Sequence, residues 1–129
     1  MFKIMEIGLL RNHEEIKPDY LRKLADEIKS DGRVKIPITV ENKHFVVLDG
    51  HHRVEALKLL GCRRIPVYLI DYFDDDITLT VWPGATVASV RKEEVIERGL
   101  SGKLFPPKTT RHIFKEKLKE VPVDLKDLY

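Results

Sequence analysis

The sequence has one cysteine, no glutamine, and no apolar run long enough to cross a membrane. A single thiol, Cys62, cannot form an internal disulfide framework, and it predicts a protein of the reducing cytoplasm. The first residues, Met1-Phe2-Lys3-Ile4, do not have the pattern of a secretory signal peptide. A net charge of only +2 argues against strong nonspecific binding to nucleic acid.

The composition is that of a folded globular protein, with 43% hydrophobic and 34% charged residues. Asparagine occurs only at Asn12 and Asn42, beside abundant lysine, glutamate and arginine, which is typical of thermophile proteins. The length of 129 residues fits one domain, and no repeat, low-complexity tract or linker interrupts it. We therefore expect a single domain over residues 1–129.

Apolar periodicity predicts strands and helices in alternation. Strands are expected at residues 2–10, 36–40, 45–48, 65–70 and 77–82. Helices are expected from Pro18 to Gly32, from the Asp49-Gly50 turn to Gly61, and from Lys92 to Arg98 with Gly99 closing the last. Residues 102–110 contain Pro106-Pro107 and predict an extended loop, and Val121-Pro122-Val123 with Leu125 predicts a terminal segment on the core. The fold class is α+β.

The segment Asp49-Gly50-His51-His52-Arg53 joins an apolar strand to an amphipathic helix. Unpaired N–H groups at a helix start carry partial positive charge and attract phosphate. Gly50 permits a close backbone approach, and Arg53 adds a bidentate donor. The alternative interpretation is an ordinary strand-to-helix turn with exposed polar residues. His51 and His52 are adjacent, so their side chains diverge and cannot easily chelate one zinc ion together.

Two carboxylates could take part in chemistry. Glu14, which follows His13, could act as a general base or a metal ligand, or could simply be exposed, and Glu15 is its rival. Asp49 could ligate Mg²⁺ or orient a nucleophile, or could cap the helix that follows it.

A third polar cluster, Lys108-Thr109-Thr110-Arg111-His112, follows the stiff proline pair. Its hydroxyls, guanidinium and imidazole suit a carboxylate or a phosphate, although a solvated basic turn is an equally good interpretation. Trp82 closes an alternating strand, where it either packs in the core or lines a pocket.

The order of these elements resembles the ParB/sulfiredoxin superfamily, a small mixed sheet with flanking short helices. Sulfiredoxin places its catalytic cysteine where His51 stands here, so sulfiredoxin chemistry is not expected. The sequence is more similar to the free L-serine kinase branch, which uses ADP or ATP. This resemblance rests on segments that cover nearly the whole chain: His13-Glu14, Ile36-Pro37-Ile38-Thr39-Val40, Leu48-Asp49-Gly50-His51-His52-Arg53, Trp82, Pro106-Pro107-Lys108-Thr109-Thr110-Arg111-His112, and Val121-Pro122-Val123 with Leu125.

The resemblance implies that adenine nucleotide phosphates bind at Gly50, His51, His52 and Arg53. It further implies that Glu14 takes the proton from the serine hydroxyl, with Asp49 assisting through Mg²⁺ or by orienting the acceptor. The remaining residues would bind the serine carboxylate or the product phosphate and form the pocket wall: Thr110, Arg111, His112 and Trp82. The product would be O-phosphoserine, a precursor of cysteine.

One departure separates this chain from that branch. The kinases are about twice as long and carry an insertion between the Trp82-like strand and the segment like Pro106–His112, whereas residues 83–89 bridge that gap here. The alternative function is a ParB-like regulatory module that binds nucleotide or DNA without catalysis. The sequence leaves the choice between ADP and ATP, the exact acceptor and the oligomeric state open.

Overall fold

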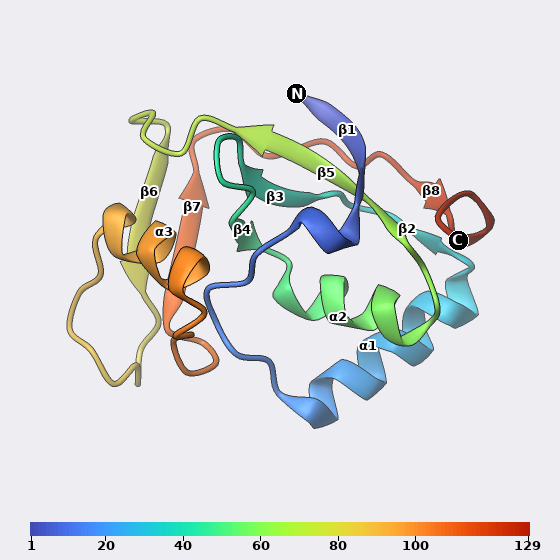
Figure 1. The fold of residues 1–129 in the computed structure, drawn as a ribbon, viewed down its shortest axis with the longest axis horizontal. Coiled ribbons are helices and arrows are strands. Elements are labelled where there is room, and N and C mark those ends of the chain that lie inside the picture. Colours follow the sequence, from blue (N-terminus) through green and yellow to red (C-terminus); the bar gives the residue numbers. More distant parts are fainter.

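A computed structural model describes all 129 residues and contains a four-stranded mixed sheet of order β1-β5-β3-β4. Figure 1 shows this sheet at the centre, with α1 and α2 packed together on one side of it. Strand β5 pairs antiparallel with β1 and parallel with β3, and β3 pairs antiparallel with β4. The bounds of these elements are β1 Phe2–Glu6, α1 Pro18–Asp31, β3 Ile38–Glu41, β4 Val47–Asp49, α2 His51–Leu59 and β5 Arg64–Ile70.

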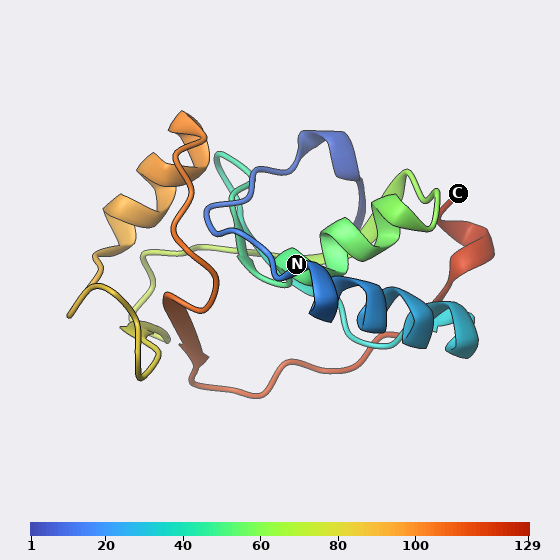
Figure 2. The same ribbon diagram turned by 90° about the horizontal axis from the view of Figure 1, so that it is seen from below.

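The remaining elements form two smaller pairs and a third helix. They are β2 Arg33–Val34 with β8 Val123–Asp124, β6 Ile77–Val81 with β7 Thr110–Phe114, α3 Lys92–Ser101, and the 3₁₀ turns Ile7–Leu9 and Leu125–Asp127. Figure 2 shows α3, β6 and β7 together at the end of the molecule opposite to the C-terminus, with a long connection from β7 back to β8. The α+β class and the small mixed sheet were predicted correctly from the sequence.

Buried apolar side chains form two clusters, and the site lies beside both. The larger cluster fills the space between the sheet and helices α1 and α2, where Ile38, Val40 and Leu57 are fully buried. The second cluster joins Val46 and Leu48 to the β6–β7 pair and to α3. Because side chains alternate across a strand, neighbouring residues of the β3–β4 hairpin contribute to different clusters.

Three sequence predictions were wrong in their details. The strand predicted for residues 2–10 ends at Glu6, because Ile7 turns inward to donate its N–H to the Arg63 carbonyl at 2.8 Å. The last helix does not stop at Gly99 but continues to Ser101. Gly102 closes it, with a φ of 76° in the left-handed region. Gly99 is small for a packing reason, since a Cβ there would lie 2.7 Å from Val46 Cγ2.

The third error is a missing strand. The sequence predicted an extended loop for residues 102–110 and no strand after it, yet Thr110–Phe114 forms β7 and pairs with β6 in full register from Ile77↔Phe114 to Val81↔Thr110. This strand begins with three consecutive polar residues, Thr110-Arg111-His112, which were interpreted only as a polar cluster. The terminal segment does dock as predicted, through β8 and the buried Leu125.

Candidate active site

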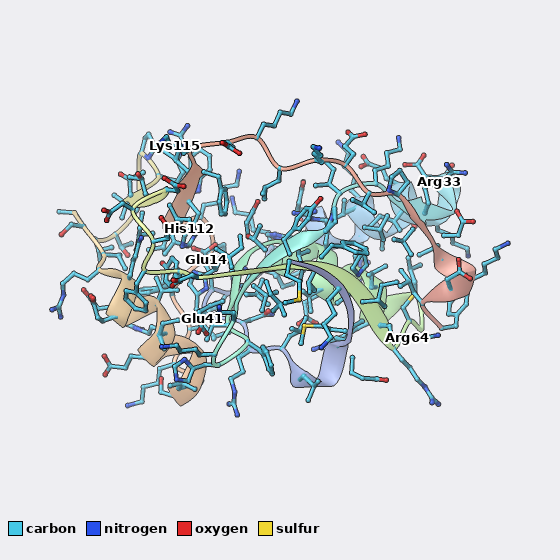
Figure 3. The ribbon with its side chains drawn as sticks, turned by 90° about the horizontal axis from the view of Figure 1, so that it is seen from above. Glu14, Arg33, Glu41, Arg64, His112 and Lys115 are labelled. Carbon is cyan, nitrogen blue, oxygen red and sulfur yellow. The ribbon has the colours of Figure 1, made fainter.

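A cavity of about 430 Å³ brings the three polar clusters of the sequence together. Glu14 comes from the segment before α1, Asp49 to Arg53 come from the end of β4 and the start of α2, and Lys108 with Thr110 to His112 comes from the start of β7. Every residue that the resemblance assigns to the site lines this cavity, whereas Glu15, the rival of Glu14, does not. Figure 3 shows Glu14 and His112 beside one another, although they are 98 positions apart in the sequence.

Gly50 shapes the first wall of the cavity, at the start of α2. Its φ of 116° lies in the left-handed region, and an added Cβ would overlap the side chain of Ile38. No side chain caps α2, and its first turn contains no acidic residue. The first N–H groups of the helix are therefore open to an anion, as helix starts that bind phosphate require.

Arg53 is held against this helix start by the chain before β3. Its Nη1 donates to the carbonyls of Ile36 at 2.6 Å and Pro37 at 3.3 Å, while Nη2 lies 3.8 Å from Asp49 Oδ2. Burial lowers the pKa of Arg53, and the Asp49 carboxylate opposes this effect. The Asp49 side chain is 67% exposed at the mouth of the cavity. These bonds hold the segment just before β3 against the start of α2.

The two histidines of α2 hold the segment before α1 in place. His52 Nε2 accepts the Lys17 N–H at 2.9 Å, and the ring meets Tyr20 edge-on at 4.7 Å. His51 Nε2 accepts the backbone N–H of His13 at 3.3 Å. One nitrogen of each ring is thus used within the protein, and the segment that carries Glu14 is fixed against α2.

Glu14 is buried, with 9% of its surface exposed, whereas Glu15 is exposed and does not line the cavity. Glu14 Oε1 accepts the N–H of Thr109 at 3.0 Å, and the N–H and hydroxyl of Thr110 at 2.8 and 3.0 Å. All three bonds end on one oxygen, so Oε2 stays available to a ligand. Burial raises the pKa of Glu14, while the bonds from β7 oppose that effect. A carboxylate in this state can accept a proton.

His13 is fully buried behind the cavity wall, whereas His112 is half-buried and lines the cavity. His13 Nδ1 donates to the Val47 carbonyl at 2.7 Å, and burial lowers its pKa to about 4. His112 Nε2 lies 2.8 Å from the Tyr72 hydroxyl, its ring also bonds the Leu48 backbone, and burial lowers its pKa to about 3. His112 was expected to bind a carboxylate or phosphate, but its ring is bonded within the protein.

Arg111 and Trp82 form the opposite wall. The Arg111 guanidinium stacks on the Trp82 ring at 4.7 Å, and the Lys108 ammonium lies 5.8 Å from the same ring. Trp82 is 39% exposed. Because the Thr110 hydroxyl contacts Glu14 and His13, Arg111 is the residue of the predicted Thr110-Arg111-His112 set that keeps free donors for a ligand.

The structure adds site residues that the sequence analysis did not select. Tyr20 and Leu24 of α1 line the cavity, but both looked like members of an apolar helical face. Lys108 also lines it and adopts a φ of 56°, in the left-handed region that non-glycine residues uncommonly hold. Its place in the basic cluster beside Thr110 was the available signal. No three histidine, cysteine or carboxylate side chains lie close enough together to hold a metal ion.

Known proteins resemble this chain over both its sequence and its fold. A sequence model of the ParB N-terminal domain matches residues 3–82, well over half of the chain. The chain belongs to the ParB N-terminal domain family. The family match ends at Trp82, so it contains the α2 start but not the Lys108 to His112 cluster.

Among its relatives, an ATP-dependent L-serine kinase of Desulfurococcus mucosus is 40% identical over 103 residues, which are 75% of this chain and 40% of the kinase. An ADP-dependent L-serine kinase of Thermococcus kodakarensis is 27% identical over 101 residues, 75% of this chain and 41% of the kinase. This ParB-family chain therefore spans about two fifths of the length of the curated relatives it matches.

A solved structure of a free serine kinase variant in complex with ADP has the same fold. Its TM-score is 0.90 at 17% identity, and the match covers 99% of this chain and 94% of the other. The predicted membership of the ParB-like superfamily is thereby confirmed, and the curated relatives named above are L-serine kinases. No helix has the length and apolar character that a membrane span requires.

Proposed function

We propose that this chain is a small-molecule kinase that transfers a phosphoryl group from ADP or ATP to the hydroxyl of free L-serine. The product would be O-phosphoserine. The observation that carries this proposal is a buried carboxylate, Glu14, in the same cavity as the uncapped start of α2. Phosphoryl transfer requires such a combination of phosphate positioning and a group that receives the hydroxyl proton. The relatives named as L-serine kinases support the same acceptor.

The nucleotide side of the cavity would be the helix-start region, which we define as residues 49–53. The open N–H groups of α2 and the Arg53 guanidinium supply donors and positive charge to the phosphates. His51 and His52 hold this turn and keep one ring nitrogen each for a ligand. Asp49, exposed at the cavity mouth, fits Mg²⁺ held mainly by nucleotide phosphates, and the ion would neutralise phosphate charge.

The acceptor side would be the strand-start region, which we define as residues 108–112, together with Glu14 and Trp82. Glu14 Oε2 takes the proton of the serine hydroxyl as the oxygen attacks phosphorus. Arg111, supported on Trp82, binds the serine carboxylate, since a guanidinium matches that group with two donors. Thr110 and His112 contribute by holding Glu14 and the cavity wall in position.

Phosphorus NMR tests this function directly. The protein is incubated with Mg²⁺ and L-serine, with ADP in one tube and ATP in another, and we expect a phosphomonoester resonance in at least one of them. Parallel tubes with L-threonine and L-homoserine define the acceptor. The absence of a phosphomonoester with every acceptor and both donors would reject the kinase proposal.

One observation favours a second function, a ParB-like module that binds nucleotide or DNA without catalysis. The chain spans only about two fifths of its kinase relatives, and the ParB match over residues 3–82 contains the helix-start region but not the strand-start region. Under this alternative, ADP or ATP would bind in a titration although no phosphomonoester forms. The net charge of +2 argues against strong nonspecific DNA binding.

A further inference from the structure

The hydroxyl of Thr110 lies between two buried acceptors. Its Oγ1 is 3.0 Å from Glu14 Oε1 and 2.8 Å from His13 Nε2. Both distances are those of good hydrogen bonds, but a hydroxyl has one hydrogen to donate. The two acceptors therefore compete for the same hydrogen.

The tautomer of His13 follows from its other contacts. Its Nδ1 faces the Val47 carbonyl at 2.7 Å, and a carbonyl can only accept, so Nδ1 carries a hydrogen. His13 is fully buried, and burial holds its pKa near 4, so the ring is neutral at pH 7. Nε2 is then a bare acceptor, and Thr110 is the group that can donate to it.

We propose that the Thr110 hydroxyl is a two-position donor, which points to Glu14 while that carboxylate is ionised and to His13 once Glu14 has taken up a proton. The inference rests on the proposed function, in which Glu14 is the base. The O–H bond of the substrate breaks, its proton binds Glu14 Oε2, and its electron pair forms the new O–P bond. The terminal P–O bond of the nucleotide breaks at the same time, and its electron pair stays on the departing nucleotide phosphate. No proton leaves Thr110 or His13, and only the direction of one hydrogen bond changes.

This arrangement sets how readily Glu14 takes a proton. A hydroxyl that donates to a carboxylate stabilises the charged form and lowers its pKa. A competing acceptor gives that hydroxyl a good bond after Glu14 is neutral, so protonation leaves no buried donor unsatisfied. His13 therefore makes Glu14 a stronger base, although it does not touch the substrate. Thr110 and His13 are positioning residues.

Other charged or titratable groups also act on Glu14 through the shared cavity. They stand on α1, the end of β4, the start of α2, the loop before β7 and the start of β7, and they are Tyr20, Asp49, His51, His52, Arg53, Lys108, Arg111 and His112. Substitution of Thr110 or His13 changes none of these side chains. His13 also contacts His51, with its Nδ1 3.1 Å from His51 Nε2, so an effect of His13 substitution on the pKa of Glu14 is assigned to the shared hydroxyl only if it disappears in the Thr110→Val background.

Carbon-13 NMR of the glutamate carboxyl groups tests the proposal in the full chain without nucleotide or serine, with Glu14→Gln to assign the resonance. Thr110→Val removes the donor at nearly constant shape, and we expect the pKa of Glu14 to rise by about one unit. His13→Asn keeps a donor near Val47 but removes Nε2, and we expect a fall of up to about one unit. Thr110→Ser, which keeps a hydroxyl, should match the wild type.

The double variant separates this switch from a purely structural role. If the Thr110 hydroxyl carries the effect, His13→Asn will not change the pKa of Glu14 in the Thr110→Val background. If His13→Asn only admits water, it will lower the pKa equally in both backgrounds, and the proposal fails. The proposal also fails if Thr110→Val leaves the pKa of Glu14 unchanged or lowers it. This test does not depend on whether a His13 variant folds.

Kinase assays supply the second readout. The acid limb of the kcat profile should move upward in pH for Thr110→Val and downward for His13→Asn, in step with the NMR titration. Because the titration contains no substrate, it decides on the switch even if no phosphoserine forms. An active enzyme whose NMR titration is unaltered by Thr110→Val would keep the proposed function and overturn the switch.

Discussion

The helix-start region and the strand-start region face each other across one cavity, but they use their polar atoms differently. At the start of α2 the backbone N–H groups are open, and the side chains of Arg53 and His52 are tied to the backbone of neighbouring segments. At the start of β7 the polar atoms of Thr110 and His112 are bonded to buried groups of the protein itself. The first region is thus built to receive an anion, and the second is built mainly to hold Glu14.

The largest expected effect comes from the carboxylate between the two regions. Glu14→Gln should reduce kcat by about 10²–10⁴-fold, since a general base contributes that much, and should leave nucleotide affinity nearly unchanged because the amide keeps the shape. Glu15→Gln is the matched control, because Glu15 is exposed and outside the cavity. A large loss in Glu15→Gln with none in Glu14→Gln would transfer the role of base to Glu15.

The buried histidines of the strand-start side should make the protein sensitive to acid. Histidine in the unfolded chain titrates near about 6.5, whereas burial lowers the pKa of His13 to about 4 and of His112 to about 3. At pH values below the pKa of histidine in the unfolded chain, the unfolded state binds more protons than the folded state. The free energy of unfolding therefore has its full value above that pKa, and it falls as the pH falls towards the pKa values of the folded state. The slope approaches about 1.4 kcal/mol per pH unit for each histidine that stays neutral.

Urea unfolding at pH values of about 7.5, 6.5 and 5.5 measures this slope. Glu14 acts in the opposite sense, because its raised pKa lets the folded state hold a proton first. The slope should therefore be steeper in Glu14→Gln than in the wild type. A free energy of unfolding that stays constant over this range would contradict the neutral, buried state of the two rings.

The two arginines provide the sharpest comparison of the regions. Arg53→Ala should weaken nucleotide binding about 10- to 100-fold, because a charge-assisted hydrogen bond worth roughly 1.5–3 kcal/mol is lost. Arg111→Ala should leave nucleotide affinity unchanged and raise the KM for serine. Titration of each variant with nucleotide in the absence of serine measures the first effect. Equal losses in both variants would show that the two arginines hold the same phosphates.

The smallest expected effect concerns the support behind the cavity wall. Tyr72→Phe removes the hydroxyl bonded to His112 and leaves a buried nitrogen without a donor, at a cost of about 1–3 kcal/mol in the free energy of unfolding. Tyr68→Phe is the matched control, since its hydroxyl bonds the Lys119 carbonyl in an exposed position. Denaturant unfolding compares the two variants. Equal stabilities would show that the bond to His112 does not support the fold.

The sequence predicted the helix-start region better than the strand-start region, and the reason is local. Gly50, the end of β4 and the start of α2 are adjacent in sequence, so their turn chemistry can be read directly. The bonds of Thr110 and His112 join residues far apart in the chain, and no spacing rule reports them. Periodicity also failed for β7, whose polar residues looked like a solvated cluster, and for Gly99, whose small size reflects contact with Val46.

The bonds from Thr109 and Thr110 to Glu14 also fix when this site can form during synthesis. The partners are 95 and 96 residues apart, so the Glu14 carboxylate leaves the ribosome long before the N–H groups that donate to it in the folded protein. Until then, burial of that charge would be costly, and water must solvate it. The sheet and α2 can assemble first from their nearer contacts, whereas the catalytic pocket closes only after β7 has been made.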